Sequence, residues 1–535
     1  MIHLVGAATA YTPYPSWLNP ADNAWQITAA TFVGLMSLPG LAVLYASIVP
    51  KKWAVNVLAM MFAGFSLVLV AWVLWSYKLG FGSTSLGGGV HNGIWTQQPA
   101  TGVNTTGTWK HFFENLWGKP GQILNSAGEQ GPAVSAANTD IPFHFPTSTL
   151  AYFQFVFAAI TPLLFLGSVL GRIKFSAWCL LVPLWSTFVY SIDAFLLWGG
   201  GYFAQEGALD FSGGYVIHMS AGVSGFTAAW VLGPRLLRDR QHFLPNNLVM
   251  AAVGAGILWL GWNGFNGGDP YYAGASMAGA VVNTNLATAV GVLVWIGLDA
   301  WFSKEKKPTF LGGVNGMICG LVGITPCAGW VNGWGAIMVG AADCAIVWLA
   351  WNFLSKVRPF SKVDDALGVI YTHGIAGFFG GLFLGLWGDP NMIEYGCGTL
   401  NKAGQVVNTA GSVVASNSSY LAGSKSCTPF GVDGLMYTGS AHQLWEQFRA
   451  AIWVIFWSAL VTFILMKLIG LVLGGVRYKD EILEVGDLAI HGEEAFPEES
   501  FATRSDGAFA LAGVAESSSP PPIGSETSSP PDAAS

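Results

Sequence analysis

Charged residues are scarce in this chain: they make up 10% of its 535 residues, whereas hydrophobic residues make up 52%. A globular domain needs a polar surface in water, so this composition excludes an ordinary soluble protein. Cysteine is also rare, and six residues are too few for a chain held together by disulfides. What remains is the composition of an integral membrane protein.

Long apolar runs are the main feature of the sequence. Crossing a hydrocarbon core of about 30 Å takes about 20 apolar residues in a helix. Eleven runs come near that length, and they predict an all-α integral membrane protein with eleven transmembrane helices in one membrane domain, residues 25–474. The predicted spans are 25–48, 53–76, 148–170, 175–198, 213–234, 246–266, 279–302, 309–329, 334–355, 366–388 and 451–474.

Basic residues predict the orientation. The short connections 199–212, 267–278 and 330–333 contain no lysine or arginine, whereas the alternating connections and the start of the C-terminal tail hold most of the chain's 23. Because basic connections stay on the cytoplasmic side, residues 1–24 are predicted outside and the C-terminus inside. No basic segment followed by an apolar run opens the chain, so no cleaved signal peptide is expected.

Two long exoplasmic loops are predicted, at 77–147 and 389–450. Each contains one glycosylation sequon, at Asn104 and at Asn417. Sequons also arise by chance in Ser- and Thr-rich loops. Two alternatives therefore stay open: these asparagines are glycosylated, or they are unmodified. No function can be assigned from the sequence to the long segment 80–147.

The second loop also contains two cysteines, Cys397 and Cys427. In an oxidising compartment they would form a disulfide that closes the loop. Two free thiols are the alternative. After the last span, residues 475–502 are predicted to form a cytoplasmic regulatory segment, and the Ser- and Pro-rich residues 503–535 a disordered tail.

One spaced pattern, D-x7-H-x2-A-G-x2-G, occurs twice, at 210–225 and at 365–380. On the predicted topology the first copy enters the membrane from outside and the second from inside, which indicates an inverted repeat of five plus five helices. Eight residues of helix rise about 12 Å. His218 and His373 should therefore approach the middle of the membrane from opposite faces and lie side by side.

The residue types within the pattern indicate different functions. Its alanines and glycines are typical of close helix packing. Asp210 and Asp365 stand where a carboxylate caps a helix N-terminus. His218 and His373 are different, because ionisable residues inside a membrane usually line a pathway. Burial favours a neutral imidazole, which suits a small polar solute and not a hydrated metal ion, so no metal site is predicted.

Aromatic residues are predicted at the outer mouth of this pathway. They are Phe153, Phe157, Trp198, Trp262 and Phe265. An interfacial aromatic belt is the alternative explanation. Asp269 beside them favours a cation site, because aromatic faces and a carboxylate both attract cations. A small cation that loses its charge before entering a dry, histidine-lined path fits the ammonium and ammonia pair.

Five segments together resemble the ammonium transporter family, the Amt/Mep/Rh superfamily, and within it the plant-type and microbial branch. They are DNAWQITAATFVGL, WGGGYFAQEGALDFSGGYVIHMSAG, GWNGFNGGDPYYA, GLVGITPCAG and VDDALGVIYTHGIAGFFGG. The resemblance covers most of residues 22–495. It implies a homotrimer in the plasma membrane, with one pore per subunit and ammonium, ammonia or methylammonium as substrate. It implies no catalytic residue, no cofactor and no nucleic-acid partner.

The resemblance also implies roles for single residues. They are an outer recruitment site at Phe157, Trp198 and Asp269 with Phe153 nearby, a phenyl gate at Phe157 and Phe265, twin histidines that line the pore and relay protons at His218 and His373, a supporting Asp210, and pore-flanking Trp262 and Thr325. Ammonium would be bound outside, lose its proton at the gate and cross as ammonia. Asp269 departs from relatives that have serine there, and a carboxylate should strengthen cation capture.

The segment 483–496 resembles the family's cytoplasmic segment that packs against the neighbouring subunit. It has no hydroxyl residue between Gly486 and His491, so phosphorylation there is not expected. Asp193 and Asp343 lie inside predicted spans without an assigned function. Two other functions stay open: an ammonium sensor, and a membrane haem protein that uses two histidines as axial ligands.

Overall fold

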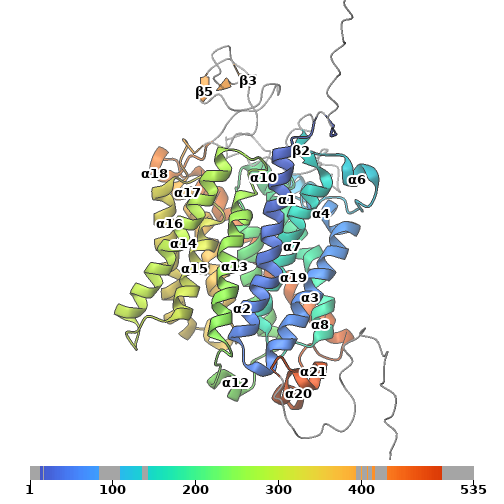
Figure 1. The fold of residues 1–535 in the computed structure, drawn as a ribbon, viewed down its shortest axis with the longest axis vertical. Helices are drawn as coiled ribbons and strands as arrows, with labels where there is room; N and C mark the ends of the chain where they lie inside the picture. The colour runs from blue at the N-terminus through green and yellow to red at the C-terminus, as the bar shows by residue number, and fades with distance from the viewer. Residues whose placement is uncertain are drawn as a thin grey trace, which may run out of the picture. The chain divides into compact units, whose positions relative to one another are not determined.

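A computed structural model describes residues 13–15, 17–82, 109–134, 142–392, 399–400, 406–407, 413–415 and 431–496. The chain up to Ala495 forms one unit of long helices, in which α1 packs against α7 and α13 (Figure 1). The predicted glycosylation sites Asn104 and Asn417, the predicted pair Cys397 and Cys427, and the predicted disordered tail lie outside the described residues.

Several membrane segments of the first half are α-helices interrupted by π-helical turns. They comprise α1 (Pro20–Leu35), η1 (Met36–Gly40), α2 (Leu41–Ile48), the 3-10 turn η2 (Lys51–Trp53), α3 (Ala54–Ala71), η3 (Trp72–Ser76), α4 (Tyr77–Phe81), α7 (Thr147–Val169), α8 (Phe175–Trp185), η4 (Ser186–Tyr190), α9 (Ser191–Leu197), α10 (Tyr202–Glu206), η5 (Gly214–Met219) and α11 (Ser220–Leu232). A π-helical turn holds an extra residue and is frequent at functional sites.

In the second half most membrane helices are continuous, and η8 is the one π-helical turn among its described residues. The elements are α12 (Leu237–Gln241), α13 (Leu248–Gly267), α14 (Ala275–Phe302), α15 (Phe310–Ile324), α16 (Gly333–Asn352), the 3-10 turns η6 (Leu354–Lys356) and η7 (Phe360–Lys362), η8 (Ile370–Ile375), α17 (Ala376–Trp387), α18 (Leu435–Thr438), α19 (His442–Val472), α20 (Asp480–Val485) and α21 (Asp487–His491).

The helical membrane architecture is confirmed, and the number of spans is close to the prediction. Ten helical segments in the described ranges are long and apolar enough to cross a membrane. The helix in the predicted eighth span, α15, has 15 residues and is shorter than the others. Pro326 follows within two residues of its end, and a proline cannot donate the backbone hydrogen bond that would continue the helix.

The last membrane helix starts earlier than predicted. α19 begins at His442, whereas the apolar run begins near residue 451. Its first turns carry buried polar side chains that have partners elsewhere. Gln443 donates to the carbonyl of Gly207 (3.0 Å), and Gln447 accepts from the amide of Leu209 (2.8 Å). By hydropathy alone, these polar residues lie outside the span. Because their side chains are hydrogen-bonded inside the protein, the helix nevertheless includes them.

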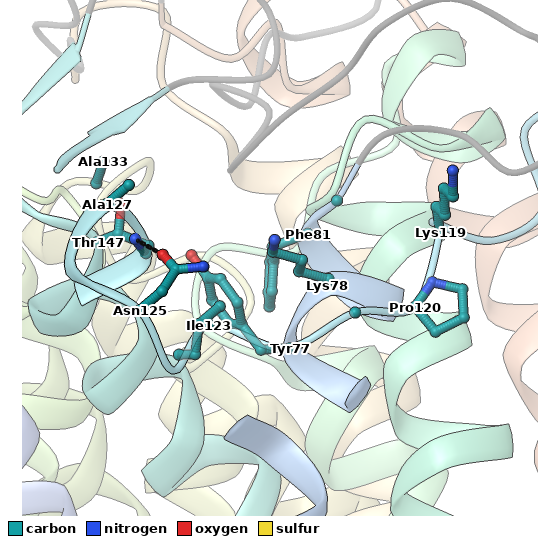
Figure 2. Close-up of a pocket in the computed structure, with 13 residues that line it drawn as sticks. Tyr77, Lys78, Phe81, Lys119, Pro120, Ile123, Asn125, Ala127, Ala133 and Thr147 are labelled. Carbon is teal, nitrogen blue, oxygen red and sulfur yellow. Dashed lines mark hydrogen bonds between the residues drawn. The ribbon is translucent and has the colours of Figure 1, made fainter. Parts of the chain in front are cut away.

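The structure describes residues 77–82, 109–134 and 142–147 of the first predicted exoplasmic loop. The loop contains α5 (Trp109–Glu114), α6 (Ser126–Gln130) and an antiparallel pair of strands, β1 (Pro132–Val134) and β2 (Pro142–Pro146). A cavity of about 520 Å³ separates it from the end of α4, and Lys78 extends into this cavity towards Asn125 (Figure 2). The second loop contains the short antiparallel strands β3 (Thr399–Leu400), β4 (Val406–Val407) and β5 (Val413–Ala415).

Glycines of the repeated pattern pack the two copies against each other. A Cβ atom on Gly222 would clash with the backbone of Gly374, and one on Gly377 would clash with the carbonyl of Gly214. Each copy therefore places a glycine against the π-helical turn of the other. The packing function predicted for these small residues is confirmed.

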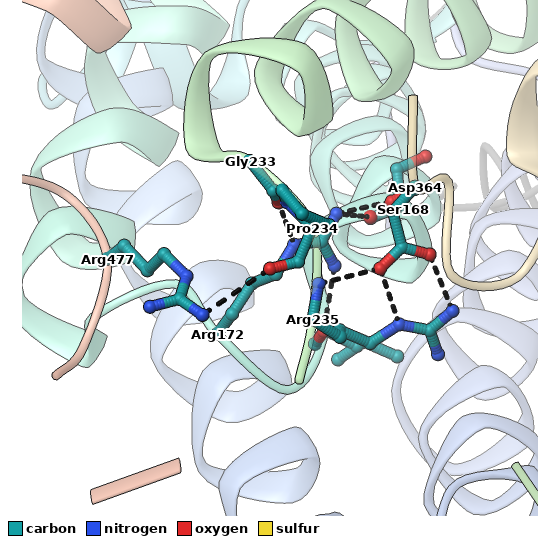
Figure 3. A network of polar contacts seen from close by, with 8 residues as sticks. Ser168, Arg172, Gly233, Pro234, Arg235, Asp364 and Arg477 are labelled. Atoms are coloured by element: carbon teal, nitrogen blue, oxygen red, sulfur yellow. Dashed lines mark hydrogen bonds and ion pairs between the residues drawn. The ribbon is translucent and has the colours of Figure 1, made fainter. Parts of the chain in front are cut away.

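A cluster of arginines fixes the connection that precedes η8 at the predicted cytoplasmic face. The buried Arg172 donates to the carbonyls of Ser168 (3.0 Å), Gly233 (2.8 Å) and Asp364. Arg235 binds the Asp364 carboxylate through two nitrogens, at 2.7 and 3.0 Å (Figure 3). Although burial opposes ionisation, hydrogen bonds and charge from Arg235 lower the pKa of Asp364.

The C-terminal segment contacts the start of α3 in its own chain. The Asp487 carboxylate accepts hydrogen bonds from the backbone amides of Val55 (2.8 Å) and Asn56 (2.9 Å). Lys52 donates to the carbonyl of Leu483 (2.9 Å). Burial raises the pKa of Asp487 to about 6, against the opposing effect of these amides. Leu483 and Asp487, at the start of the segment 483–496, are therefore anchored to the basic connection between the first two spans and to the helix that follows it.

Candidate functional site

Five aromatic and imidazole rings follow one another through the helix bundle. The centroid distances are 4.7 Å from Phe153 to Phe157, 4.3 Å from Phe157 to Phe265, 5.7 Å from Phe265 to His218, and 5.6 Å from His218 to His373. All five side chains are buried. We call this series the aromatic line. It brings together residues of α7, α13, η5 and η8 that the sequence analysis assigned to one pathway.

Trp198 stands beside the aromatic line near Phe157, at a centroid distance of 6.5 Å and nearly perpendicular to it. Its indole nitrogen donates to the backbone carbonyl of Asp210 (2.7 Å). The carboxylate of Asp210 in turn accepts from the amides of Tyr215 and Val216, both at 2.9 Å. Asp210 therefore caps η5, as predicted, and its backbone carbonyl fixes Trp198 in place.

Asp269 lies at the same end of the aromatic line and is only 5% exposed. Ser212 donates a hydrogen bond to one of its carboxylate oxygens, and the hydroxyl of Tyr271 donates to the other (3.2 Å). Gln154 completes the group by donating from its side-chain amide to the Tyr271 hydroxyl (3.0 Å). A carboxylate, a hydroxyl and an amide thus meet where the rings begin, which is a polar site suited to a small cation.

Sequence reasoning missed three of these polar residues, Gln154, Ser212 and Tyr271. A signal for Gln154 was present, because it is a polar residue within the apolar run YFQFVFAAI. Nothing in the sequence distinguishes Ser212 and Tyr271 from ordinary polar residues in a connection. Their contribution depends on contacts with residues far away in the chain.

Phe157 and Phe265 are the most closely spaced pair of rings in the aromatic line, and their planes are tilted by 33°. Trp262 packs against Phe265 at 4.9 Å. The Trp262 indole donates to the Thr325 hydroxyl (2.9 Å), which itself donates to the carbonyl of Leu321 (2.7 Å). The two residues predicted as pore-flanking therefore form one hydrogen-bonded unit behind the phenyl pair.

The two histidines have different partners. His218 stacks on Trp262 at 5.2 Å, and neither of its ring nitrogens is hydrogen-bonded to a protein atom within the described ranges. His373 is bonded through Nδ1 to the Thr372 hydroxyl (2.9 Å), a partner that sequence reasoning missed. A neutral imidazole offers one donor and one acceptor, so the pair can hydrogen-bond a small polar solute that passes along the aromatic line.

Two further carboxylates are buried away from the aromatic line. Asp193 is bonded to Ser458 at 3.4 Å, whereas neither oxygen of Asp343 has a hydrogen-bond partner in the part of the chain that the structure describes. We have no physical explanation for either. In the same described part, no three histidine, cysteine, aspartate or glutamate residues are grouped so that they could hold a metal ion.

Known proteins resemble this chain over nearly its whole length. The model of the Ammonium Transporter Family matches residues 24–496. Ammonium transporter 3 member 2 of Oryza sativa subsp. japonica is 40% identical over 496 residues, covering 90% of this chain and 90% of that protein. Ammonium transporter 2 of Arabidopsis thaliana is 40% identical over 497 residues, covering 91% of each.

The fold also resembles that of solved structures. The crystal structure of Saccharomyces cerevisiae Mep2 superimposes with a TM-score of 0.66 at 25% identity, over 86% of this chain and 90% of that one. The structure of Candida albicans Mep2 gives the same TM-score and identity, over 87% and 88%. The family model and these relatives show that the chain belongs to the ammonium transporter family.

Proposed function

We propose that the aromatic line is the route by which this transporter moves its substrate. Ammonium binds at the outer end among Phe157, Trp198 and Asp269, loses its proton at the phenyl pair, and continues as ammonia past His218 and His373. The observation that carries the proposal is the unbroken series of buried rings from Phe153 to His373, with the Asp269 carboxylate bonded to Tyr271 beside Phe153 at its outer end.

Each step follows from the groups present. At the outer end, each desolvated aromatic face attracts a cation by about 1–2 kcal/mol, and the Asp269 carboxylate adds charge attraction. Beyond Phe265 the path is lined by the buried rings of His218 and His373, and an isolated charge in such surroundings is costly. Deprotonation removes that charge. The proton either returns to water at the outer end or passes along His218 and His373 to the inside, and current in voltage-clamped cells distinguishes the two. Ammonia keeps its lone pair and three N–H groups, which match the acceptor and donor nitrogens of His218 and His373.

The setting of the route is part of the proposal. We place the chain in the plasma membrane as a homotrimer with one route per subunit, the N-terminus outside and the C-terminus inside. Of eleven spans, with α15 as the eighth, the first ten form two inverted halves of five. The basic connections support the orientation, and the reciprocal contacts of Gly222 and Gly377 with the opposite copy of the pattern support the repeat.

Transport and its charge can be tested together. Expressed in a cell that lacks its own ammonium transporters, the chain should restore growth on low ammonium. No growth despite delivery to the membrane would contradict the proposed route and favour a sensor. In voltage-clamped cells, an inward current that depends on ammonium would indicate that the proton also crosses, whereas uptake without current would indicate that ammonia crosses alone.

The outer site has its own test. Replacing Asp269 with alanine removes the charged acceptor, so the apparent KM for ammonium should rise about tenfold, since a hydrogen bond to a charged group contributes about 1.5 kcal/mol. The apparent KM of Asp269→Ser should lie between that of the wild type and that of Asp269→Ala. Glu129→Ala is a matched control, because Glu129 is an exposed carboxylate of α6 in the same predicted exoplasmic region. An unchanged KM in Asp269→Ala would contradict the outer site.

A further inference from the structure

Tyr271 has an unusual backbone conformation. Its φ angle is 61°, in the left-handed region that a residue with a large side chain rarely adopts. A turn accompanies it, in which the Tyr271 amide donates to the carbonyl of Gly268 (3.0 Å). Strained residues of this kind persist only when their surroundings hold them, and they gather at functional sites. The strain raises the question of what the Tyr271 side chain gains.

The side chain closes the outer end of the aromatic line. The ring of Tyr271 meets the ring of Phe153 edge to face at 5.9 Å, and its hydroxyl joins Gln154 to Asp269. The turn itself lies directly on Phe153, because a Cβ atom on Gly268 would clash with that ring. Tyr271 and Phe157 therefore both pack on the ring of Phe153.

Two other parts of the chain hold this turn in place. On one side, Phe143 of β2 packs on the Tyr271 ring at 5.2 Å. On the other side, Asp22 of α1 accepts from the amide of Ala273 (2.9 Å) and contacts His144 of β2 at 3.3 Å. The described part of the first loop thus contributes to the site, because β2 packs on the side of Tyr271 and holds it against Phe153.

We propose that Tyr271 is a specificity-determining residue that forms the roof of the outer site. Its hydroxyl orients the Asp269 carboxylate towards a bound cation, and its ring limits the space above Phe153 to unsubstituted ammonium. Methylammonium replaces one N–H by a methyl group, which must point at a wall of the site. The inference rests on the proposed outer site and adds a selectivity that this site alone does not require.

The test compares methylammonium with ammonium in uptake measurements on the full-length transporter. Tyr271→Gly removes the ring and also relieves the left-handed strain, since glycine adopts positive φ readily. The ratio of KM for methylammonium to KM for ammonium should fall about tenfold, the lower end of what a pocket gains from excluding one methyl-sized group. Tyr271→Phe keeps the ring, so this ratio should stay unchanged while both KM values rise about threefold.

Tyr272→Gly is the matched control, because the neighbouring ring packs on Phe143 and His144 at 6.1 and 5.9 Å. It should leave the ratio of KM values unchanged. If Tyr271→Gly does not reach the membrane, Tyr271→Asn replaces it, because asparagine also tolerates the left-handed region. An unchanged ratio in the delivered variant, together with a raised KM in Asp269→Ala, overturns the roof and keeps the outer site. Unchanged KM values in Asp269→Ala overturn the outer site itself.

Discussion

His218 lies in η5 and His373 in η8, and each of these π-helical turns follows an aspartate whose side chain accepts hydrogen bonds from backbone amides at the start of the turn. Asp210 is buried, and Asp365 is half-buried. The two turns otherwise differ. Asp210 binds the amides of Gly213, Tyr215 and Val216, whereas the Asp365 side chain accepts from Ile370 at 2.9 Å.

The histidines themselves also differ in how their side chains are held. Two aromatic rings, Trp262 and Phe265, hold His218 by stacking, and its nitrogens are left to the route. A hydrogen bond with the Thr372 hydroxyl occupies one nitrogen of His373. The same sequence pattern thus gives two different environments. His218 is held by ring stacking next to the phenyl pair, and His373 is held by a hydrogen bond farther along the aromatic line.

The largest difference is expected when each histidine is replaced by alanine. In His218→Ala the free donor and acceptor next to the gate are lost, and uptake should fall about 100-fold, as for the loss of a positioned proton-transfer group. His373→Ala should reduce uptake less, about tenfold, because one of its nitrogens is already occupied. Initial uptake rates at equal membrane abundance measure both, and wild-type rates in both variants would refute the histidine route.

The two caps should differ in stability. Asp210→Ala leaves several amides of η5 without a partner and should lower the free energy of unfolding by about 2 kcal/mol, against about 1 kcal/mol for Asp365→Ala. Thermal unfolding of the purified proteins in detergent measures the difference. Asp210→Asn and Asp365→Asn are the controls, since an amide oxygen still accepts. Equal losses at both positions would mean that the two turns are held alike.

The smallest effect is expected at Thr372. Thr372→Val keeps the shape of the side chain but removes the hydroxyl that orients His373, so uptake should fall about threefold, as for one neutral hydrogen bond. Thr372→Ser retains the hydroxyl and should transport like the wild type. If Thr372→Val also behaves like the wild type, the hydrogen bond does not position His373, and the contrast between the histidines reduces to the stacking on His218.

The meeting of His218 and His373 could be predicted because it depends on helix rise and span count alone. Two copies of one spacing that enter from opposite faces must come together near the middle. The caps at Asp210 and Asp365 followed from the same pattern. Residues whose function depends on distant contacts could not be found this way. Tyr271 binds Gln154 across 117 positions of sequence, and no local pattern encodes that distance.

Helix boundaries at which buried polar residues continue the helix could not be predicted from the sequence either. The start of α19 is an example, because Gln443 and Gln447 look like the end of a span until their partners Gly207 and Leu209 are known. The position of β2 over Tyr271 is another. A loop rich in small polar residues carries no periodic signal, so its ordered pieces emerge only from their packing.

The π-helical turns at the histidines make chain length there more critical than residue type. A π-helical turn contains one residue more than the α-helical turn it replaces. Deleting a single residue from η5 would rotate everything before it by about 100° relative to α11. The Asp210 cap could then not stay in register while Gly222 kept its contact with Gly374. Substitutions within Gly214–Met219 should therefore be tolerated more often than one-residue deletions, and relatives that transport should keep this spacing.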